Sequence, residues 1–140
     1  MNKIHESWMN LALIEAREAF RNKEIPIGAI IIKDNKIIGK GYNQVELLKD
    51  STAHAEMIAI TSACNTLNDW RLNECDIYVT LEPCAMCAGA IIKSRLRNVF
   101  FGSYNNNDGC VSSIYNLCND SRFNHKSGVQ GGILNQECSY

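Results

Sequence analysis

The feature that most constrains this chain is a pair of short segments that together offer three metal ligands. Residues 83–87 read P-C-A-M-C, and residues 54–56 read H-A-E. Two cysteines at positions i and i+3 lie on one face of a helix, so both sulfurs can reach the same ion. Pro83 is typical of a helix start, and the positive end of a helix favours thiolate over thiol. The sequence therefore predicts that Cys84 and Cys87 bind a metal at the start of a helix.

His54 and Glu56 are two residues apart and cannot share a face of a regular helix. Both can serve one site only if the metal lies beyond the N-terminus of their helix. Asp50, Ser51 and Thr52 are candidate N-caps that would put the helix end there. His54 and the two cysteines make three protein ligands, which is the pattern of catalytic zinc sites that keep one position for water. We expect Glu56 to be the catalytic base beside that water.

Three other interpretations stay open at this point. The C-x-x-C pair by itself could be redox-active. A structural zinc site would need a fourth ligand, and the candidates are Cys64, Cys75, Cys110, Cys118, Cys138 and His125. Glu56 could be an ordinary solvated helix residue. The first alternative leaves the H-A-E motif unexplained and the second leaves Glu56 without a role, so we favour a catalytic site with one Zn²⁺ per chain.

Composition bounds the class of protein. A chain of 140 residues, 46% hydrophobic and 21% charged, is expected to form a single domain, residues 1–140. We expect no membrane association, because no apolar run is long enough to span a bilayer, and the N-terminus begins an amphipathic pattern. The seven cysteines are odd in number and scattered, which favours the reducing cytoplasm. A net charge of −1 gives no support for the basic surface typical of RNA-binding proteins.

The hydrophobic pattern predicts the order of the elements. We expect a helix over about 3–22, a hairpin of strands 25–33 and 36–42 around an Asp34-Asn35 turn, a polar loop over 44–51, a helix over 53–65, a strand over 76–81, a helix over 84–95, a strand over 98–102, at most a short helix within 113–119, a last strand within 124–130 and the start of a helix at 133. Gly28 and Gly39 inside strands indicate close approach of another backbone or of a ligand. We therefore expect an α/β fold, a three-layer α/β/α sandwich with a mixed, mostly parallel five-stranded sheet.

Beyond the metal motif, several segments carry a resemblance to a known family. The combination H-x-E … P-C-x-x-C is the signature of zinc nucleobase deaminases. The chain resembles bacterial tRNA-specific adenosine deaminases of the cytidine deaminase superfamily over Trp8 and residues 24–29, 41–43, 52–56, 78–84, 86–90, 101–102, 123–125 and 132–134. The zinc motif is specific to the superfamily, and the flanking segments indicate the family within it.

The resemblance implies a cytidine deaminase-like fold and hydrolytic deamination of adenosine to inosine at the wobble position of a tRNA anticodon. The partner would be the anticodon stem-loop, and two copies would pair through the helices beside the zinc site. Glu56 would carry a proton from water to N1 of the ring and then to the departing amine. One rival is a small-molecule deaminase of the same fold that acts on guanine, cytosine or CMP. The other is a non-enzymatic, zinc-stabilised module that binds RNA or protein.

The resemblance also implies four substrate contacts, made by Asn43, Ile25, Ala55 and Asn105. The amide of Asn43 can both donate and accept at a purine edge, although an Asn that stabilises a turn is the alternative. Ile25 would line the base pocket, or belong to the core as a strand residue. Asn105 stands where the family usually has an Asp that accepts a hydrogen bond from a ribose hydroxyl. This change weakens the expected preference for RNA over DNA.

Two further departures concern RNA binding. Gln44 replaces a residue that is usually Arg in the family. The last helix of the family continues with basic and aromatic residues that help to hold the tRNA, whereas this sequence ends at residue 140. We therefore expect the domain to lack the end of that helix.

Overall fold

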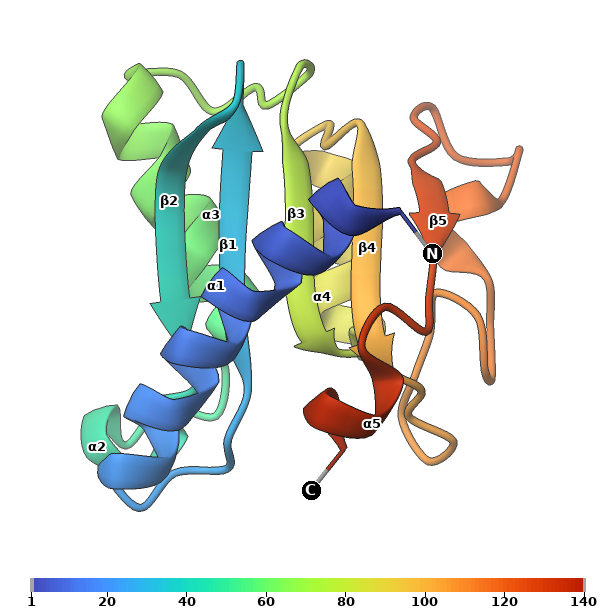
Figure 1. The fold of residues 1–140 in the computed structure, drawn as a ribbon. Coiled ribbons are helices and arrows are strands. Elements are labelled where there is room, and N and C mark those ends of the chain that lie inside the picture. The colour runs from blue at the N-terminus through green and yellow to red at the C-terminus, as the bar shows by residue number, and fades with distance from the viewer. Residues whose placement is uncertain (1, 140) are drawn as a thin grey trace.

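The structure is a computed structural model that describes residues 2–139. It has a five-stranded sheet with helices on both faces (Figure 1). In chain order the elements are α1 (Lys3–Arg21), β1 (Gly28–Lys33), β2 (Lys36–Tyr42), α2 (Val45–Leu48), α3 (Ala55–Leu67), β3 (Asp76–Leu81), α4 (Ala85–Lys93), β4 (Asn98–Ser103), the 3₁₀ helix η1 (Leu117–Asn119), β5 (Gly128–Gln130) and α5 (Asn135–Cys138). Of the helices described, none combines the length and the apolar character that a membrane crossing requires.

The sheet has the strand order β2-β1-β3-β4-β5. β1 is antiparallel to both of its neighbours, whereas β3, β4 and β5 are parallel to one another. Four strands thus point the same way, and only β1 runs against them (Figure 1). Asp34 and Asn35 connect β1 to β2 with positive φ angles of 52° and 61°, the backbone of a tight hairpin turn. The mixed, mostly parallel sheet and its hairpin are therefore confirmed.

Helices cover both faces of the sheet, which confirms the three-layer sandwich. α1 and α5 pack on one face around Met9, Ile30 and Tyr78, and α3 and α4 pack on the other. A Cβ on Gly39 would lie 2.6 Å from a main-chain oxygen of α3, and one on Gly28 would collide with the main chain of α1. The close backbone approach that these two glycines predict is confirmed, and it lets the helices lie directly against the hairpin.

The structure corrects several predicted boundaries. β1 begins at Gly28 and not at residue 25, because residues 25–27 form a tight turn in which the Ile27 N–H donates to the Ile25 carbonyl at 2.8 Å. Ile25 is therefore outside the strand and 54% exposed, so its alternative as a core residue is wrong. The segment predicted to be a polar loop contains the short helix α2. β5 covers only three residues of its predicted range, and α5 only four.

Candidate active site

Two helix N-termini meet at the edge of the sheet where β2, β3 and β4 end (Figure 1). His54 is the N-cap residue of α3 and Cys84 is the N-cap residue of α4, and neither side chain caps its own helix. Cys87 follows in the first turn of α4. The metal-binding motif therefore lies at helix starts, as its sequence predicts. The predicted N-caps Asp50, Ser51 and Thr52 are wrong, because Asp50 instead accepts a hydrogen bond from the Thr52 N–H at 2.8 Å and forms a turn before the helix.

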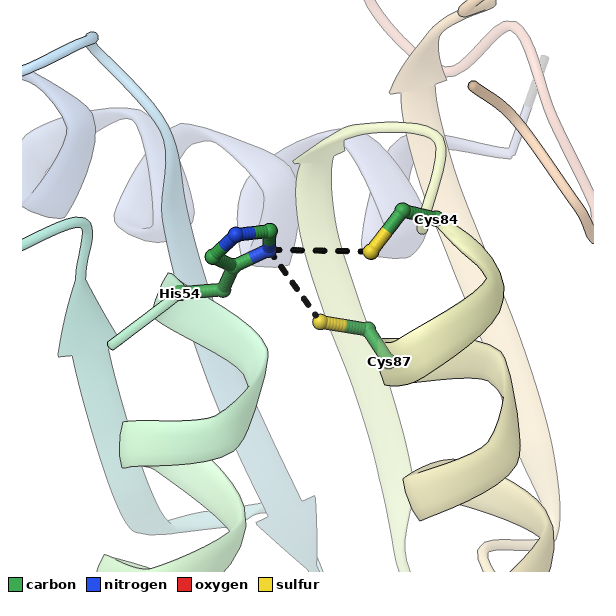
Figure 2. A group of neighbouring side chains, drawn as sticks. All are labelled: His54, Cys84 and Cys87. Atoms are coloured by element: carbon green, nitrogen blue, oxygen red, sulfur yellow. Dashed lines mark hydrogen bonds between the residues drawn. The ribbon is translucent and has the colours of Figure 1, made fainter. Parts of the chain in front are cut away.

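His54, Cys84 and Cys87 point toward one another across the gap between α3 and α4 (Figure 2). Nδ1 of His54 lies 3.6 Å from each sulfur, and the three ligand atoms lie within 4.8 Å of one another. A tetrahedral zinc ion, with bonds of about 2.3 Å to sulfur and about 2.0 Å to nitrogen, holds its S and N ligands about 3.5 Å apart. The observed separations fit that ion.

Among residues 2–139, no fourth metal-binding side chain joins this group. His125, one of the candidates for a closed site, instead bonds through Nε2 to the Leu96 carbonyl at 2.7 Å. Cys118 is fully buried and lies 3.9 Å from the Ala88 carbonyl. The site therefore has the three-ligand composition of catalytic zinc centres, in which water or substrate completes the coordination.

The two thiols of this group influence each other. The hydrogen bond from Cys87 lowers the pKa of Cys84 to about 5. The same contact raises the pKa of the Cys87 thiol, and burial raises it further. Cys84 is therefore a thiolate at neutral pH. Thiolate sulfur together with imidazole nitrogen is a donor set well suited to zinc.

Glu56 is the second residue of α3, and its side chain lies beside the metal ligands. It is only 4% exposed. Burial raises the pKa of this carboxyl group to about 7, against opposing contributions from its own backbone N–H, His54 and the Cys87 thiol. A carboxyl group with a pKa near neutrality can both take up and release a proton, which is what general acid–base catalysis requires. The burial and the raised pKa of Glu56 are compatible with a catalytic base, and that role stays a prediction.

His54, Glu56 and Cys84 open into a cavity of about 970 Å³, whereas Cys87 is fully buried behind them. Most of its lining residues lie within residues 23–27, 43–51, 81–84 and 103–108, and His54, Glu56 and Ser139 complete it. A cavity of this size falls at the upper end of the range typical of small-molecule sites, roughly 300–1,000 Å³. It is large enough for a nucleoside and part of its flanking groups.

Asn43 and Ile25 line this cavity, as the resemblance implies. The amide nitrogen of Asn43 donates to the Ile25 carbonyl at 3.4 Å, and its oxygen accepts from the Val45 N–H at 3.2 Å. An amide has two N–H donors and two acceptor positions. Asn43 thus stabilises its loop and still has one donor and one acceptor with which it can contact a base, so its two interpretations are compatible.

Asn105 also lines the cavity, whereas Ala55 does not. The side-chain oxygen of Asn105 accepts from the backbone N–H groups of Asn107 at 3.2 Å and Asp108 at 3.1 Å. Both acceptor positions of that oxygen are used, so Asn105 can offer a ligand only its amide N–H₂ group. The side chain of Ala55 is fully buried in the core between α3 and the sheet. Contact between Ala55 and a substrate would therefore involve its backbone.

Two buried carboxylates in the cavity wall have no role in the sequence-based prediction. Glu24 accepts from the backbone N–H groups of Glu46 at 3.0 Å and Leu47 at 2.7 Å, and so fixes the start of α2. Glu82 is 1% exposed and bonds to the loop that carries Asn105. Glu24 precedes an apolar run and Glu82 follows one. A carboxylate next to an apolar strand is a signal from which their burial could have been predicted.

The fold and the three-ligand site define a zinc-dependent deaminase of the cytidine deaminase type. The family model for the cytidine and deoxycytidylate deaminase zinc-binding region matches residues 2–103. The tRNA-specific adenosine deaminase of Bacillus subtilis (strain 168) is 44% identical over 133 residues, which cover 95% of this chain and 83% of the relative. That of Aquifex aeolicus (strain VF5) is 47% identical over 121 residues, with 86% and 80% covered. The chain belongs to the family of tRNA-specific adenosine deaminases.

Solved structures of deaminases share this fold. A structure from a study of A-to-I editing by tRNA:A34 deaminases at the wobble position of transfer RNA superposes with a TM-score of 0.90 at 39% identity, covering 94% of this chain and 96% of the other. The guanine deaminase of Bacillus subtilis superposes with a TM-score of 0.70 at 41% identity, covering 74% and 66%. The cytidine deaminase-like fold is therefore confirmed.

Proposed function

We propose that this protein catalyses the zinc-dependent hydrolytic deamination of adenosine to inosine at the wobble position of a tRNA anticodon. The observation that carries the proposal is the grouping of three metal ligands at one open cavity that His54, Cys84 and the buried Glu56 line. The names of the relatives at 44% and 47% identity support adenosine in tRNA as the substrate. The tRNA:A34 deaminase structure supports the wobble position.

The residues around the cavity have different roles in this reaction. Zinc held by His54, Cys84 and Cys87 would supply the Lewis acid that activates water for attack on C6 of the ring. Glu56 takes one proton from the attacking water and delivers it to N1. It then takes the second proton from the new hydroxyl group on C6 and delivers it to the amine as the C6–N bond breaks. The reaction consumes one water molecule and releases one ammonia, so Glu56 returns to its starting state. Asn43 orients the base through its remaining donor and acceptor.

A tRNA anticodon loop presents its bases in an unpaired, accessible form, so the wobble adenosine can be extruded into the cavity. Ile25 is exposed in the cavity wall and offers an apolar surface for the base. Asn105 would contact the ribose through its amide N–H₂ group, because its oxygen is occupied. A ribose hydroxyl can accept such a hydrogen bond as well as donate one.

The decisive experiment is an inosine assay on zinc-loaded protein. The substrates are an anticodon stem-loop with adenosine at the wobble position and, separately, free adenosine, cytidine and guanine, with Glu56→Gln as the control. We expect inosine in the stem-loop alone, and none with the control. Turnover of a free base or nucleoside without stem-loop activity would instead favour a small-molecule deaminase. Stem-loop binding without any deamination would favour the non-enzymatic module.

We also propose that the protein is a homodimer in the cytoplasm. An open groove of about 650 Å³ lies along α3 beside the zinc site, with Met57, Ile58 and Thr61 among its lining residues, and it supports pairing through that helix. All seven cysteines are free thiols, which supports a reducing compartment. Sedimentation equilibrium tests the dimer: a mass of two chains is expected, and Ile58→Glu should reduce it to one. A wild-type mass of one chain at micromolar concentration would refute the dimer.

A further inference from the structure

Glu82 is a buried carboxylate that the deamination chemistry does not use. It directly follows β3 and stands two residues before Cys84. A carboxylate that is only 1% exposed must be compensated by hydrogen bonds. Its donors all come from one segment, residues 105–113, which belongs to a loop that we name the rim loop (residues 104–113).

The hydrogen bonds of Glu82 use both of its oxygens. Oε1 accepts from the backbone N–H of Asn105 at 3.1 Å and from the hydroxyl of Ser113. Oε2 accepts from the backbone N–H groups of Ser112 and Ser113, both at 2.8 Å. A carboxylate has about four acceptor positions, and here four donors fill them. Glu82 therefore has no acceptor position left for a substrate, although it lies in the cavity wall.

The rim loop is shaped to fit this carboxylate. A Cβ on Gly109 would collide with the carboxylate carbon of Glu82, so only glycine allows the loop to pass this closely. The Gly109 N–H donates to the Asn105 carbonyl at 2.8 Å and closes the turn. The Cys110 N–H donates to the Pro83 carbonyl at 2.9 Å, which ties the loop to the residue before the metal ligand Cys84.

Residues 104–108 of the rim loop line the cavity. Their place relative to the zinc ligands thus depends on the short segment Glu82–Cys84, which holds the loop on one side and a metal ligand on the other. We propose that Glu82 is a positioning residue that fixes the rim loop relative to the zinc site, so that residues 104–108 are preorganised for the nucleotide substrate. This inference rests on the proposed function for its substrate, and on the contacts of Glu82 for its geometry.

Glu82→Gln tests the proposal. The amide has the same shape but offers one acceptor oxygen and places an N–H₂ group against N–H donors, so part of the loop is released. We expect the KM for the anticodon stem-loop to rise about tenfold or more, the loss typical of one or two charged hydrogen bonds. We expect kcat to change less than threefold and zinc to remain at one ion per chain. Ser113→Ala removes one donor of the four and should raise KM by a smaller factor.

The matched control is Asp76→Asn. Asp76 is also a buried carboxylate, at the opposite end of β3, and it bonds to Arg97 at 2.9 and 3.0 Å and to Asn98 at 3.0 Å. It lies outside the cavity lining, so its change tests general destabilisation. The proposal would be overturned if the two variants lost the same amount of Tm and Asp76→Asn raised KM as much as Glu82→Gln does.

Hydrogen exchange separates this inference from the proposed function, because it needs no substrate. Glu82→Gln should accelerate amide exchange at residues 105, 112 and 113 by tenfold or more, while Asp76→Asn leaves those amides unchanged. Unchanged exchange of the three amides in Glu82→Gln would overturn the positioning role, even in a protein that deaminates the stem-loop. A wild-type protein that deaminates no stem-loop would refute the proposed function, and the exchange result would still test the contact between Glu82 and the rim loop.

Discussion

The two sides of the cavity are built in different ways, as a comparison of one buried glutamate from each side shows. On the zinc side, Glu56 lies at the start of a regular helix, and burial raises its pKa to about 7. On the loop side, burial also acts on Glu82, but the hydrogen bonds from Ser113, Asn105 and Ser112 hold its pKa below the ordinary value. Glu56 can therefore exchange a proton near neutral pH, whereas Glu82 stays ionised.

The difference indicates a division of labour. Helix starts fix the reactive groups His54, Glu56 and Cys84 within a rigid frame of α3, α4 and the sheet. The loop side takes its shape from side chains that bond to distant backbone groups, as Glu24 and Glu82 do. Substitutions on the zinc side should therefore abolish the reaction. Substitutions on the loop side should alter the strength and selectivity of substrate binding. The following predictions test this division, from the largest expected effect to the smallest.

Cys84→Ala should have the largest effect. It removes one of three ligands, and because metal binding is coupled to folding, zinc and stability should be lost together. We expect less than a tenth of the wild-type zinc content, no detectable activity and a free energy of unfolding lower by about 2 kcal/mol or more. Metal analysis and urea denaturation measure these changes. Cys75→Ala, at another buried cysteine, should keep full zinc content. One zinc per chain in Cys84→Ala would point to another ligand set.

Glu56→Gln should remove the chemistry but leave the frame intact. The amide has the same volume as the carboxyl group but cannot take up a proton, so we expect kcat to fall by roughly 10²–10⁴-fold. Zinc content and KM should stay close to the wild-type values. Single-turnover kinetics with metal analysis provides the measurement, and Glu15→Gln on α1, outside the cavity, is the control. Activity within threefold of the wild type would show that Glu56 is not the proton carrier.

The zinc side could be predicted from the sequence because its information is local. The spacing of the metal-binding motif and the apolar run of β3 each depend on residues within a few positions. The predicted range of β3, residues 76–81, agrees with the structure, and the predicted helix over 3–22 differs from α1 by one residue. The close approaches at Gly28 and Gly39 also follow from glycine inside apolar strands.

The loop side could not be predicted in the same way, because its shape depends on contacts distant in sequence. The helix α2 has only four residues, and two of its backbone N–H groups bond to Glu24, more than twenty residues earlier. The rim loop likewise depends on Glu82, about thirty residues away. Patterns in a single sequence indicate periodicity and local turns. They do not indicate that a carboxylate bonds to backbone N–H groups more than twenty residues away.

Asn43→Ala tests whether a loop residue serves both the loop and the substrate. It removes the bonds to Ile25 and Val45 together with the donor and acceptor that remain for the base. We expect kcat/KM to fall by roughly 10–100-fold, as for the loss of one or two hydrogen bonds to substrate. Asn43→Asp keeps the acceptor for the Val45 N–H but loses the N–H₂ donor. Its kcat/KM should fall nearly as far as that of Asn43→Ala. A lower Tm with unchanged kcat/KM at 20 °C would mean that Asn43 stabilises its loop but does not contact the substrate.

Asn105→Asp should have the smallest effect on activity and the clearest effect on selectivity. An aspartate can still accept from the backbone N–H groups of Asn107 and Asp108, so the loop should keep its shape. It replaces the amide N–H₂ with a second acceptor oxygen, which can bond to a ribose 2′-hydroxyl but finds no such donor on deoxyribose. One charged hydrogen bond of about 1.5 kcal/mol then corresponds to roughly a tenfold greater preference for RNA over DNA.

The measurement is the ratio of kcat/KM on RNA and DNA stem-loops of the same sequence, each with adenosine at the wobble position. Asn106→Asp, the next residue of the rim loop, adds the same charge without the bonds of Asn105 and serves as the control. A ratio for Asn105→Asp within twofold of the wild type would mean that the side chain of Asn105 does not contact the sugar. A shift that Asn106→Asp reproduces would mean that net charge sets the preference. A shift specific to position 105 would mean that one side-chain atom of the rim loop sets the preference for ribose over deoxyribose. The zinc side would then carry out the same reaction on RNA and on DNA.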